Sequence, residues 1–272
     1  KQEEHCTRKH SVVLSKKNLY RFYLRKKKAM RETTISYLKQ GDIAHMDLLE
    51  EIRRGTGDQK MESSKGILLQ DRRSKAYLLS TEDEEFREEA LRQIWGAEVI
   101  AVHQLNLVQR IQELFPYRRC LCCRQAVYGG KKPILFQSPA RLQELSLAFL
   151  PALQRHYSGH ADQKYLRGSL EEGVMIGAFL GEALAGFVGQ HEEGSMGLLE
   201  VLPEYRGRGI GKALLAAAVN WQLERGQVPY SQIVDGNEIS YRLHRSMGFS
   251  ITPQVSVYWL MEPVEGKGKL EE

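Results

Sequence analysis

The chain has 272 residues, of which 42% are hydrophobic and 27% charged, a composition typical of a globular protein with a packed core. No apolar run approaches the roughly 20 residues that a membrane-spanning helix needs. The run from Ser11 to Leu14 is too short to be the core of a signal peptide. We therefore expect a cytoplasmic protein of one large or two small domains.

The net charge of +5 is unevenly distributed. Residues 1–29 contain ten Lys or Arg and two Glu, a net charge of +8, whereas the rest of the chain has a net charge of −3. The run from Arg25 to Lys28 could contact nucleic acid or anionic lipid. A flexible, solvated extension is the simpler interpretation, because no helix-turn-helix or basic-aromatic platform accompanies it. We expect no specific nucleic-acid partner.

Residues 30–131 are expected to form a smaller α+β domain. Its predicted helices and strands follow in chain order: helix Asp42–Arg54, strands Gly66–Gln70 and Lys75–Ser80, helix Thr81–Ile94 with Thr81 as its cap, strand Glu98–His103, helix Asn106–Leu114 and strand Cys120–Tyr128. Cys120, Cys122 and Cys123 share the last strand without a second group of ligands. This spacing predicts buried thiols and no metal site.

Residues 132–263 are expected to form a second domain, and residues 264–272 a frayed tail. Its predicted elements are strand Ile134–Gln137, helices Pro139–His156 and Ala161–Glu171, strands Val174–Leu180, Ala183–Gln190 and Met196–Leu202, helix Gly211–Arg225, strand Ser231–Val234, helix Asn237–Met247 and a final strand pair that ends with Val255–Leu260. The first domain follows a similar order without a glycine-rich turn. It is either a degenerate half-repeat of the second or an unrelated α+β domain.

The glycine-rich turn is the most informative stretch of the sequence. Pro203 ends an apolar strand, and Gly207, Gly209 and Gly211 lead directly into a strong helix-forming run. At such a helix N-terminus, free backbone N–H groups and the helix dipole attract an anion, and glycine lets the backbone approach it. The turn predicts a phosphate site. It matches neither the Walker nor the Rossmann glycine pattern.

Two motifs carry a resemblance to a known family. The residues from Arg206 to Gly211 fit the pattern R/Q-x-x-G-x-G/A, and Asn237, Ser240, Leu243, Gly248 and Phe249 fit N-x-x-S/A-x-x-L/F-Y-x-x-x-G-F. Together they resemble the GNAT superfamily of acyl-CoA N-acyltransferases, closest to its glycine N-acyltransferase-like branch. The resemblance implies an α+β fold with a mixed sheet whose central strands splay apart to admit acyl-CoA.

The resemblance also implies where acyl-CoA binds. The pyrophosphate would lie on the glycine turn, and the backbone N–H near Val201 would polarise the thioester carbonyl. The co-substrate is expected to be acetyl-CoA or another acyl-CoA, with no metal. The residues expected to bind it are Leu199, Val201, Arg206, Gly207, Arg208, Gly209, Ile210, Gly211, Lys212, Asn237 and Ser240.

The sequence offers two candidates for each proton-transfer group. The branch often has a glutamate at the position of Ser195, so Glu193 and Glu200 are the candidate bases. Glu193 shares the parity of Ser195 in a regular strand, and Glu200 shares it only if a bulge intervenes. The family's tyrosine, which protonates the thiolate, is replaced by His244. We expect His244 or Tyr241 to supply that proton.

The expected function is transfer of an acyl group, most simply acetyl, to a primary amine by direct attack in a ternary complex. The acceptor would be a small-molecule amine or an amino-acid-like molecule. A catalytically weak acyl-CoA-binding or regulatory module is the alternative, because of Ser195 and His244. The sequence does not define the acceptor, the acyl-chain length or the oligomeric state.

Overall fold

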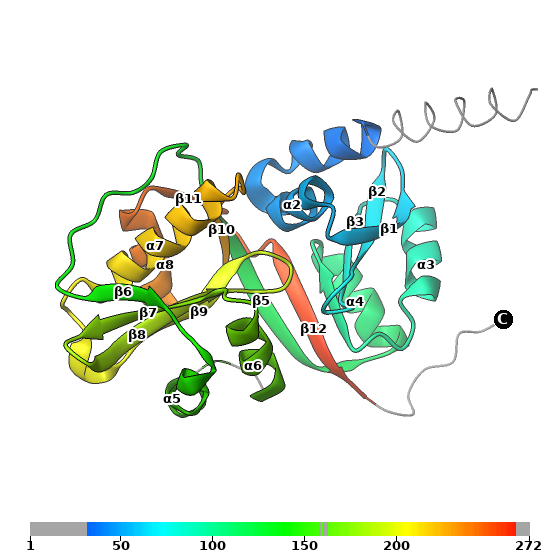
Figure 1. The fold of residues 1–272 in the computed structure, drawn as a ribbon. Coiled ribbons are helices and arrows are strands. Elements are labelled where there is room, and N and C mark those ends of the chain that lie inside the picture. The colour runs from blue at the N-terminus through cyan, green and yellow to red at the C-terminus, as the bar shows by residue number, and fades with distance from the viewer. Residues whose placement is uncertain (1–31, 158, 160–162, 265–272) are drawn as a thin grey trace, which may run out of the picture.

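A computed structural model describes residues 32–157, 159 and 163–264 (Figure 1). The basic extension of residues 1–29 and nearly all of the predicted tail lie outside the described residues. The N-terminal half contains a helix over residues 32–40, then η1 (Asp42–His45), α2 (Met46–Arg54), β1 (Gly57–Glu62), β2 (Gly66–Asp71), β3 (Tyr77–Thr81), α3 (Glu84–Gln93), β4 (Val99–Val102), α4 (Leu105–Leu114) and β5 (Tyr117–Tyr128).

The C-terminal half begins after a connector of residues 129–140. It contains β6 (Arg141–Glu144), η2 (Leu147–Phe149), α5 (Leu150–His156), α6 (Gln163–Glu171), β7 (Met175–Leu180), β8 (Ala183–Gln190), β9 (Met196–Val201), η3 (Pro203–Tyr205), α7 (Ile210–Glu224), β10 (Tyr230–Val234), α8 (Glu238–Ser246), β11 (Phe249–Ile251) and β12 (Val257–Pro263).

One mixed sheet runs through both halves in the order β1-β2-β3-β4-β12-β5-β10-β9-β8-β7-β6, with β11 paired to β5 (Figure 1). The two halves exchange their last strands. β5 pairs antiparallel with β10 of the C-terminal half, and β12 pairs antiparallel with β4 of the N-terminal half. β5 and β12 also pair with each other at the centre of the sheet. The exchange makes each half depend on a strand supplied by the other.

The two halves follow the same plan. In the N-terminal half β1, β2 and β3 form an antiparallel run and β3 pairs in parallel with β4. In the C-terminal half β7, β8 and β9 form the same run and β9 pairs in parallel with β10. Helices α3 and α7 connect the parallel strands, as a crossover connection requires. The predicted half-repeat therefore has a structural basis in the strand order.

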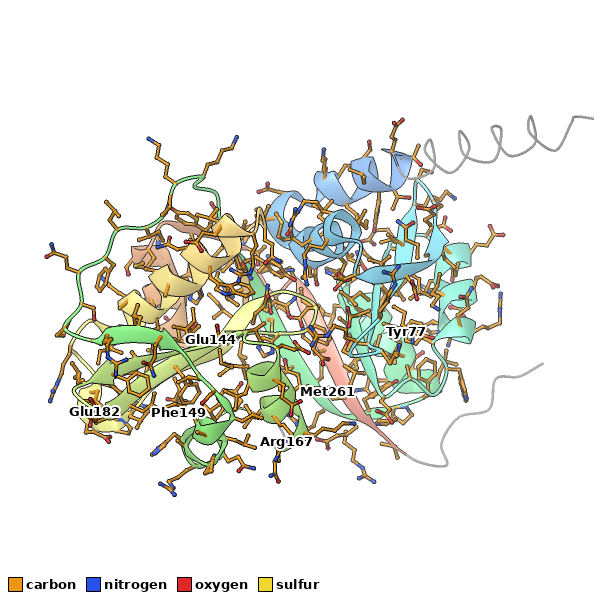
Figure 2. The ribbon with its side chains drawn as sticks, in the orientation of Figure 1. Tyr77, Glu144, Phe149, Arg167, Glu182 and Met261 are labelled. Atoms are coloured by element: carbon orange, nitrogen blue, oxygen red, sulfur yellow. The ribbon has the colours of Figure 1, made fainter. Side chains whose placement is uncertain are left out.

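Each half is a three-layer sandwich with a core on both faces of its sheet. Leu91, Ile100 and Ile111 belong to a core beneath α3 and α4, and Leu214 and Val219 to one beneath α7. On the other face, separate cores pack under α2 and under α5 and α6. Figure 2 shows Phe149 and Arg167 on the α5–α6 side of the sheet, away from α7.

The element predictions were wrong in several places. Residues 134–137 form no strand, and the chain enters the sheet at β6, where a helix was predicted. Leu142 and Leu145 have the spacing of one helix face, but in an extended chain residues three apart lie on opposite faces, so Leu145 is buried and Leu142 is exposed. The predicted helix from Asp42 divides into η1 and α2, and β1 was not predicted. Helix α3 begins later than expected, with Asp83 rather than Thr81 as its cap.

Candidate functional site

Strands β9 and β10 separate toward their carboxyl ends. Within the described residues, their pairing is confined to Met196 opposite Ser231, near the start of both strands. The strands then diverge toward Val201 and Val234. The predicted splayed pair is therefore present, and it opens a V between two parallel strands at the edge where ligands of such sheets bind.

A bulge in β9 decides which side chains face this opening. The interval from Gly197 to Glu200 lies opposite the shorter interval from Phe187 to Gly189 on β8. The extra residue lies at Leu198, which has a φ of +53°. Because the bulge reverses the alternation, Glu200 joins the face of Leu198, which packs toward α5 and α6, while Leu199 and Val201 pack toward α7.

The backbone of Val201 is directed into the opening. Leu202 donates its N–H to Ala185 on the β8 side, and successive residues of a strand direct their backbone groups to opposite edges. The carbonyl of Val201 is on the far edge and accepts a hydrogen bond of 2.9 Å from Arg206 Nε. The N–H of Val201 therefore points from the same edge toward β10, where the expected thioester contact requires a donor.

The glycine turn has the conformation of an anion-binding loop. Gly207 and Gly209 have φ values of +76° and +78°, which glycine adopts without a Cβ penalty. Gly209 is the N-cap of α7, with no side-chain hydrogen bond at the cap. The N–H groups of the first turn therefore have no side-chain cap acceptor at Gly209. Gly211 lies just inside the helix, next to Val201 and Leu243.

The basic side chains of the turn have local partners. Arg206 pairs with Glu200 at 3.3 Å in addition to its bond with the Val201 carbonyl, and Arg208 lies over the Tyr205 ring. Lys212 is exposed in the first turn of α7, and Ile210 is buried in the core beneath this helix. Arg206 therefore links the glycine turn to both candidate groups of β9.

Helix α8 begins where the second motif predicts. The side chain of Asn237 accepts a hydrogen bond of 3.0 Å from the backbone N–H of Ser240, and Gly248 has a φ of +84° beyond the helix. Because β9 and β10 are parallel, the N-termini of α7 and α8 lie at the same edge of the sheet. Asn237 and Ser240 are thus near the mouth of the opening.

His244 does not have the environment expected of a proton donor. Its Nδ1 donates to the Ser240 carbonyl at 2.8 Å, and its Nε2 accepts from the Ser231 hydroxyl at 3.0 Å. Burial lowers the pKa of His244 to about 4, so the ring is neutral at physiological pH. A buried neutral ring argues against the expected histidine acid, and this side chain links α8 to β10 where β9 and β10 pair.

Tyr241 is also directed away from the opening. Arg124 of β5 lies over its ring at 5.9 Å, and β5 is on the other side of β10 from β9. Leu243, not Tyr241, is the residue of α8 that approaches Gly211 of α7. The contacts of the two expected acids are therefore with Arg124 for Tyr241 and with Ser231 and Ser240 for His244.

Glu193 and Ser195 meet at the junction of the two halves. The buried hydroxyl of Ser195 donates to the carboxylate of Glu193. The carbonyl of Glu193 accepts hydrogen bonds of 2.8 Å from Arg54 of α2 and from the hydroxyl of Tyr230. The structure thus places Glu193 next to the position where the family resemblance expects a glutamate.

Aromatic side chains surround these carboxylates on the α5–α6 face. Tyr165 hydrogen-bonds to His191 at 2.6 Å, and its pKa is raised by burial and by Glu193. Burial and the nearby Glu200 raise the pKa of Tyr157. Neither tyrosine carries a motif of its own: Tyr157 follows α5 and Tyr165 lies on α6, and both are distant from β9 in the sequence.

The described strands of the N-terminal half leave no corresponding opening. β3 and β4 stay paired through Leu79 and Val102, and His103 continues the ladder with a bond to the Leu79 carbonyl. This half is nonetheless joined to the site through Gln232 of β10, whose amide donates to Asp47 of α2 at 3.2 Å. The splayed pair in the C-terminal half therefore defines the candidate site.

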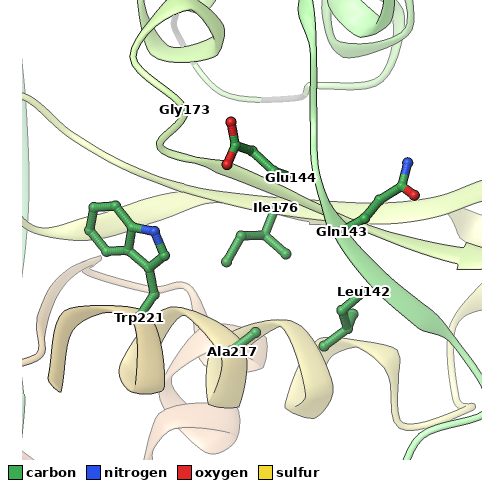
Figure 3. A pocket seen from close by; sticks show the side chains of 7 residues that line it. All are labelled: Leu142, Gln143, Glu144, Gly173, Ile176, Ala217 and Trp221. Carbon is green, nitrogen blue, oxygen red and sulfur yellow. The ribbon is translucent and has the colours of Figure 1, made fainter. Parts of the chain in front are cut away.

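A separate hollow of about 240 Å³ lies between α7 and the β6–β7 edge (Figure 3). Trp221 and Ala217 of α7 face Leu142 and Ile176 across it, with Glu144 at its side. Its lining includes none of the residues of the glycine turn or of β9, so we do not assign it to the candidate site. Among the residues that the structure describes, no three His, Cys, Asp or Glu side chains form a metal-binding group.

Comparisons with known proteins agree with this geometry. Residues 140–249 match the model of the acetyltransferase (GNAT) family. No curated protein matches the chain. Similar solved structures include a GNAT-family protein from Novosphingobium aromaticivorans, which is 16% identical with a TM-score of 0.55 over 81% of this chain and 97% of that one.

Two further structures match over slightly more of the chain. A GCN5-related N-acetyltransferase-like protein from Streptococcus suis is 15% identical with a TM-score of 0.53 over 85% of this chain and 99% of that one. A GCN5-related N-acetyltransferase from Kribbella flavida is 13% identical with a TM-score of 0.52 over 82% and 95%. Identities this low show the fold alone. The fold is a mixed α+β structure with a GNAT domain in its C-terminal half, and the likeness extends over both halves.

Proposed function

We propose that this protein is an acyl-CoA-dependent N-acyltransferase whose catalytic site is the opening between β9 and β10. The observation that carries this proposal is the left-handed glycine turn at the N-cap of α7, directly beside a splayed pair of parallel strands. GNAT acetyltransferases take acetyl-CoA or another acyl-CoA as co-substrate. In this chain the pyrophosphate would accept hydrogen bonds from the backbone N–H groups of residues 208–211.

The thioester end of acyl-CoA would enter the opening from the side of α7 and α8. The N–H of Val201 would bond the thioester oxygen and stabilise the negative charge that develops on it. The amine nitrogen then attacks the carbonyl carbon, and the tetrahedral intermediate expels the CoA thiolate and leaves an amide. Both substrates would be bound together, because the amine approaches from the α5–α6 face.

Glu200 is our first candidate for the base that takes the proton of the amine. The bulge at Leu198 directs Glu200 to the α5–α6 face, and its side chain is only 13% exposed. Glu193 is the second candidate. It would act through the Ser195 hydroxyl, which donates a hydrogen bond to its carboxylate. Since His244 and Tyr241 are both held elsewhere, water is our candidate donor to the thiolate.

The finer identity of the enzyme is also a proposal. We place it near the glycine N-acyltransferase-like branch, with acetyl as the simplest acyl group and a small-molecule amine or amino-acid-like acceptor. We retain residues 30–131 and 132–263 as its two parts. The exchanged strands β5 and β12 imply that these parts fold together.

A binding module without turnover is the second candidate function. Two observations favour it: Ser195 stands in place of a glutamate, and both ring nitrogens of His244 are engaged in hydrogen bonds. Mass spectrometry of acetyl-CoA incubated with amines, amino acids and polyamines separates the two candidates. An enzyme yields an acylated amine and one free CoA per amide, whereas a binding module retains acyl-CoA unchanged.

A further inference from the structure

The connector between the two halves passes beside the glycine turn. Residues 129–140 run from the end of β5 past α7 to β6 (Figure 1). Ile134 is fixed to α7 by two hydrogen bonds with Asn220, one of 2.7 Å from its N–H and one of 3.0 Å to its carbonyl. A connector held at this point has a defined path, although it has no regular secondary structure.

Phe136 lies at the N-cap of α7. A Cβ atom built on Gly209 would be 3.5 Å from the end of the Phe136 ring, and apart from the chain neighbours of Gly209 no other described side chain lies within 4 Å of that point. The ring is nevertheless 39% exposed. An aromatic face in partial contact with solvent therefore borders the turn that we assign to the pyrophosphate.

The same edge of the sheet exposes other apolar side chains. Val234 at the end of β10 is 38% exposed, and Ile239 in the first turn of α8 is 80% exposed. Exposed apolar side chains that gather at one edge indicate a surface that a ligand covers. The carboxyl ends of β9 and β10, and therefore the starts of α7 and α8, share this edge.

We propose that Phe136 binds the adenosine part of acyl-CoA and so makes the connector a component of the co-substrate site. This inference rests on the proposed function. With the thioester between β9 and β10 and the pyrophosphate on the glycine turn, the nucleotide extends outward from the sheet past the N-cap of α7. Phe136 presents an aromatic face there, and an aromatic ring can stack on the adenine base.

Calorimetric titration with CoA and with 4′-phosphopantetheine, which lacks the adenosine and the two phosphates attached to it, tests this proposal. Base–aromatic stacking typically contributes about 1–3 kcal/mol, so Phe136→Ala should weaken CoA binding by about tenfold. It should leave the affinity for 4′-phosphopantetheine unchanged, and Phe136→Trp should restore CoA binding. Leu135→Ala is the matched control, because Leu135 is the adjacent connector residue and is 95% exposed.

Each result decides the question. If Phe136→Ala binds CoA as the wild type does, or loses affinity for both ligands equally, Phe136 does not contact the adenosine. Equal losses accompanied by a lower melting temperature indicate that the ring only supports the glycine turn. Failure of the assigned acyl-CoA site is distinguishable, because the wild-type protein itself would then not bind CoA. A protein that binds CoA without acyl transfer leaves this titration unaffected and is recognised by the absence of amide.

Discussion

The glycine turn can be tested by giving Gly209 a β-branched side chain. A non-glycine residue at a φ of +78° costs about 1–2 kcal/mol, and valine is among the least tolerant. Steric contact adds little to this cost, because a Cβ at this position would be 3.5 Å from Phe136, which is an ordinary van der Waals distance. The loss of stability in Gly209→Val would therefore come mainly from the backbone.

Gly226 offers a matched control at the other end of α7. It has a φ of +65°, and a Cβ there would meet no atom within 4 Å. Gly226→Val should therefore lose a similar 1–2 kcal/mol of stability while leaving the anion site intact. Both variants should show a similar decrease in the free energy of unfolding, measured by urea denaturation.

CoA affinity should separate the two variants. If Gly209→Val relieves its strain by rotating the turn, at least one charge-assisted hydrogen bond of about 2 kcal/mol is lost. This corresponds to about thirtyfold weaker binding. Calorimetric titration should show this loss for Gly209→Val and none for Gly226→Val. Equal CoA affinity in the two folded variants would refute the assignment of the pyrophosphate.

Three further predictions concern titratable groups. Glu200→Gln should lower kcat by about 10²–10⁴-fold with little change in CoA affinity. If kcat falls by this amount in Glu193→Gln and not in Glu200→Gln, Glu193 is the base. His244 has a pKa of about 4 in the folded protein against 6.5 in the unfolded chain, so the protein should lose about 3 kcal/mol as the pH falls from 6.5 to 4. His244→Gln should flatten this slope in urea denaturation, and an unchanged slope would show that another group causes it. Burial raises the pKa of Glu51 to about 8, so stability is lost as the pH rises from 4.5 to 8. Glu51→Gln should raise the melting temperature by more at pH 8 than at pH 5, and a rise of the same size at both would contradict the shift.

The glycine turn and the start of α8 could be predicted because their signals are local. Gly207 and Gly209 are residues that adopt a positive φ, and the side chain of Asn237 caps a helix through its own neighbours. The bulge at Leu198 could not be predicted in the same way, since two adjacent leucines do not indicate which one interrupts a strand. Only the pairing with β8 defines it.

Long-range pairing accounts for most of what the sequence did not predict. The exchange of β5 and β12 depends on pairs of residues that are distant in the sequence, such as Cys123 and Val234. Neither strand has a motif that indicates which strand it pairs with. His244 shows the limit for a site residue. The motif placed it at the family's tyrosine position, but its hydrogen bonds to Ser231 and Ser240 depend on how α8 packs on β10.

The most direct test of the central claim is the simultaneous measurement of free thiol and acylated amine during incubation of the full chain with acetyl-CoA and a panel of amines. We predict that at least one amine yields amide and CoA in equal amounts, and that Gly209→Val abolishes both while Gly226→Val retains them. Acetyl-CoA that binds but remains intact with every amine, or thiol release that does not depend on an amine, would contradict an N-acyltransferase.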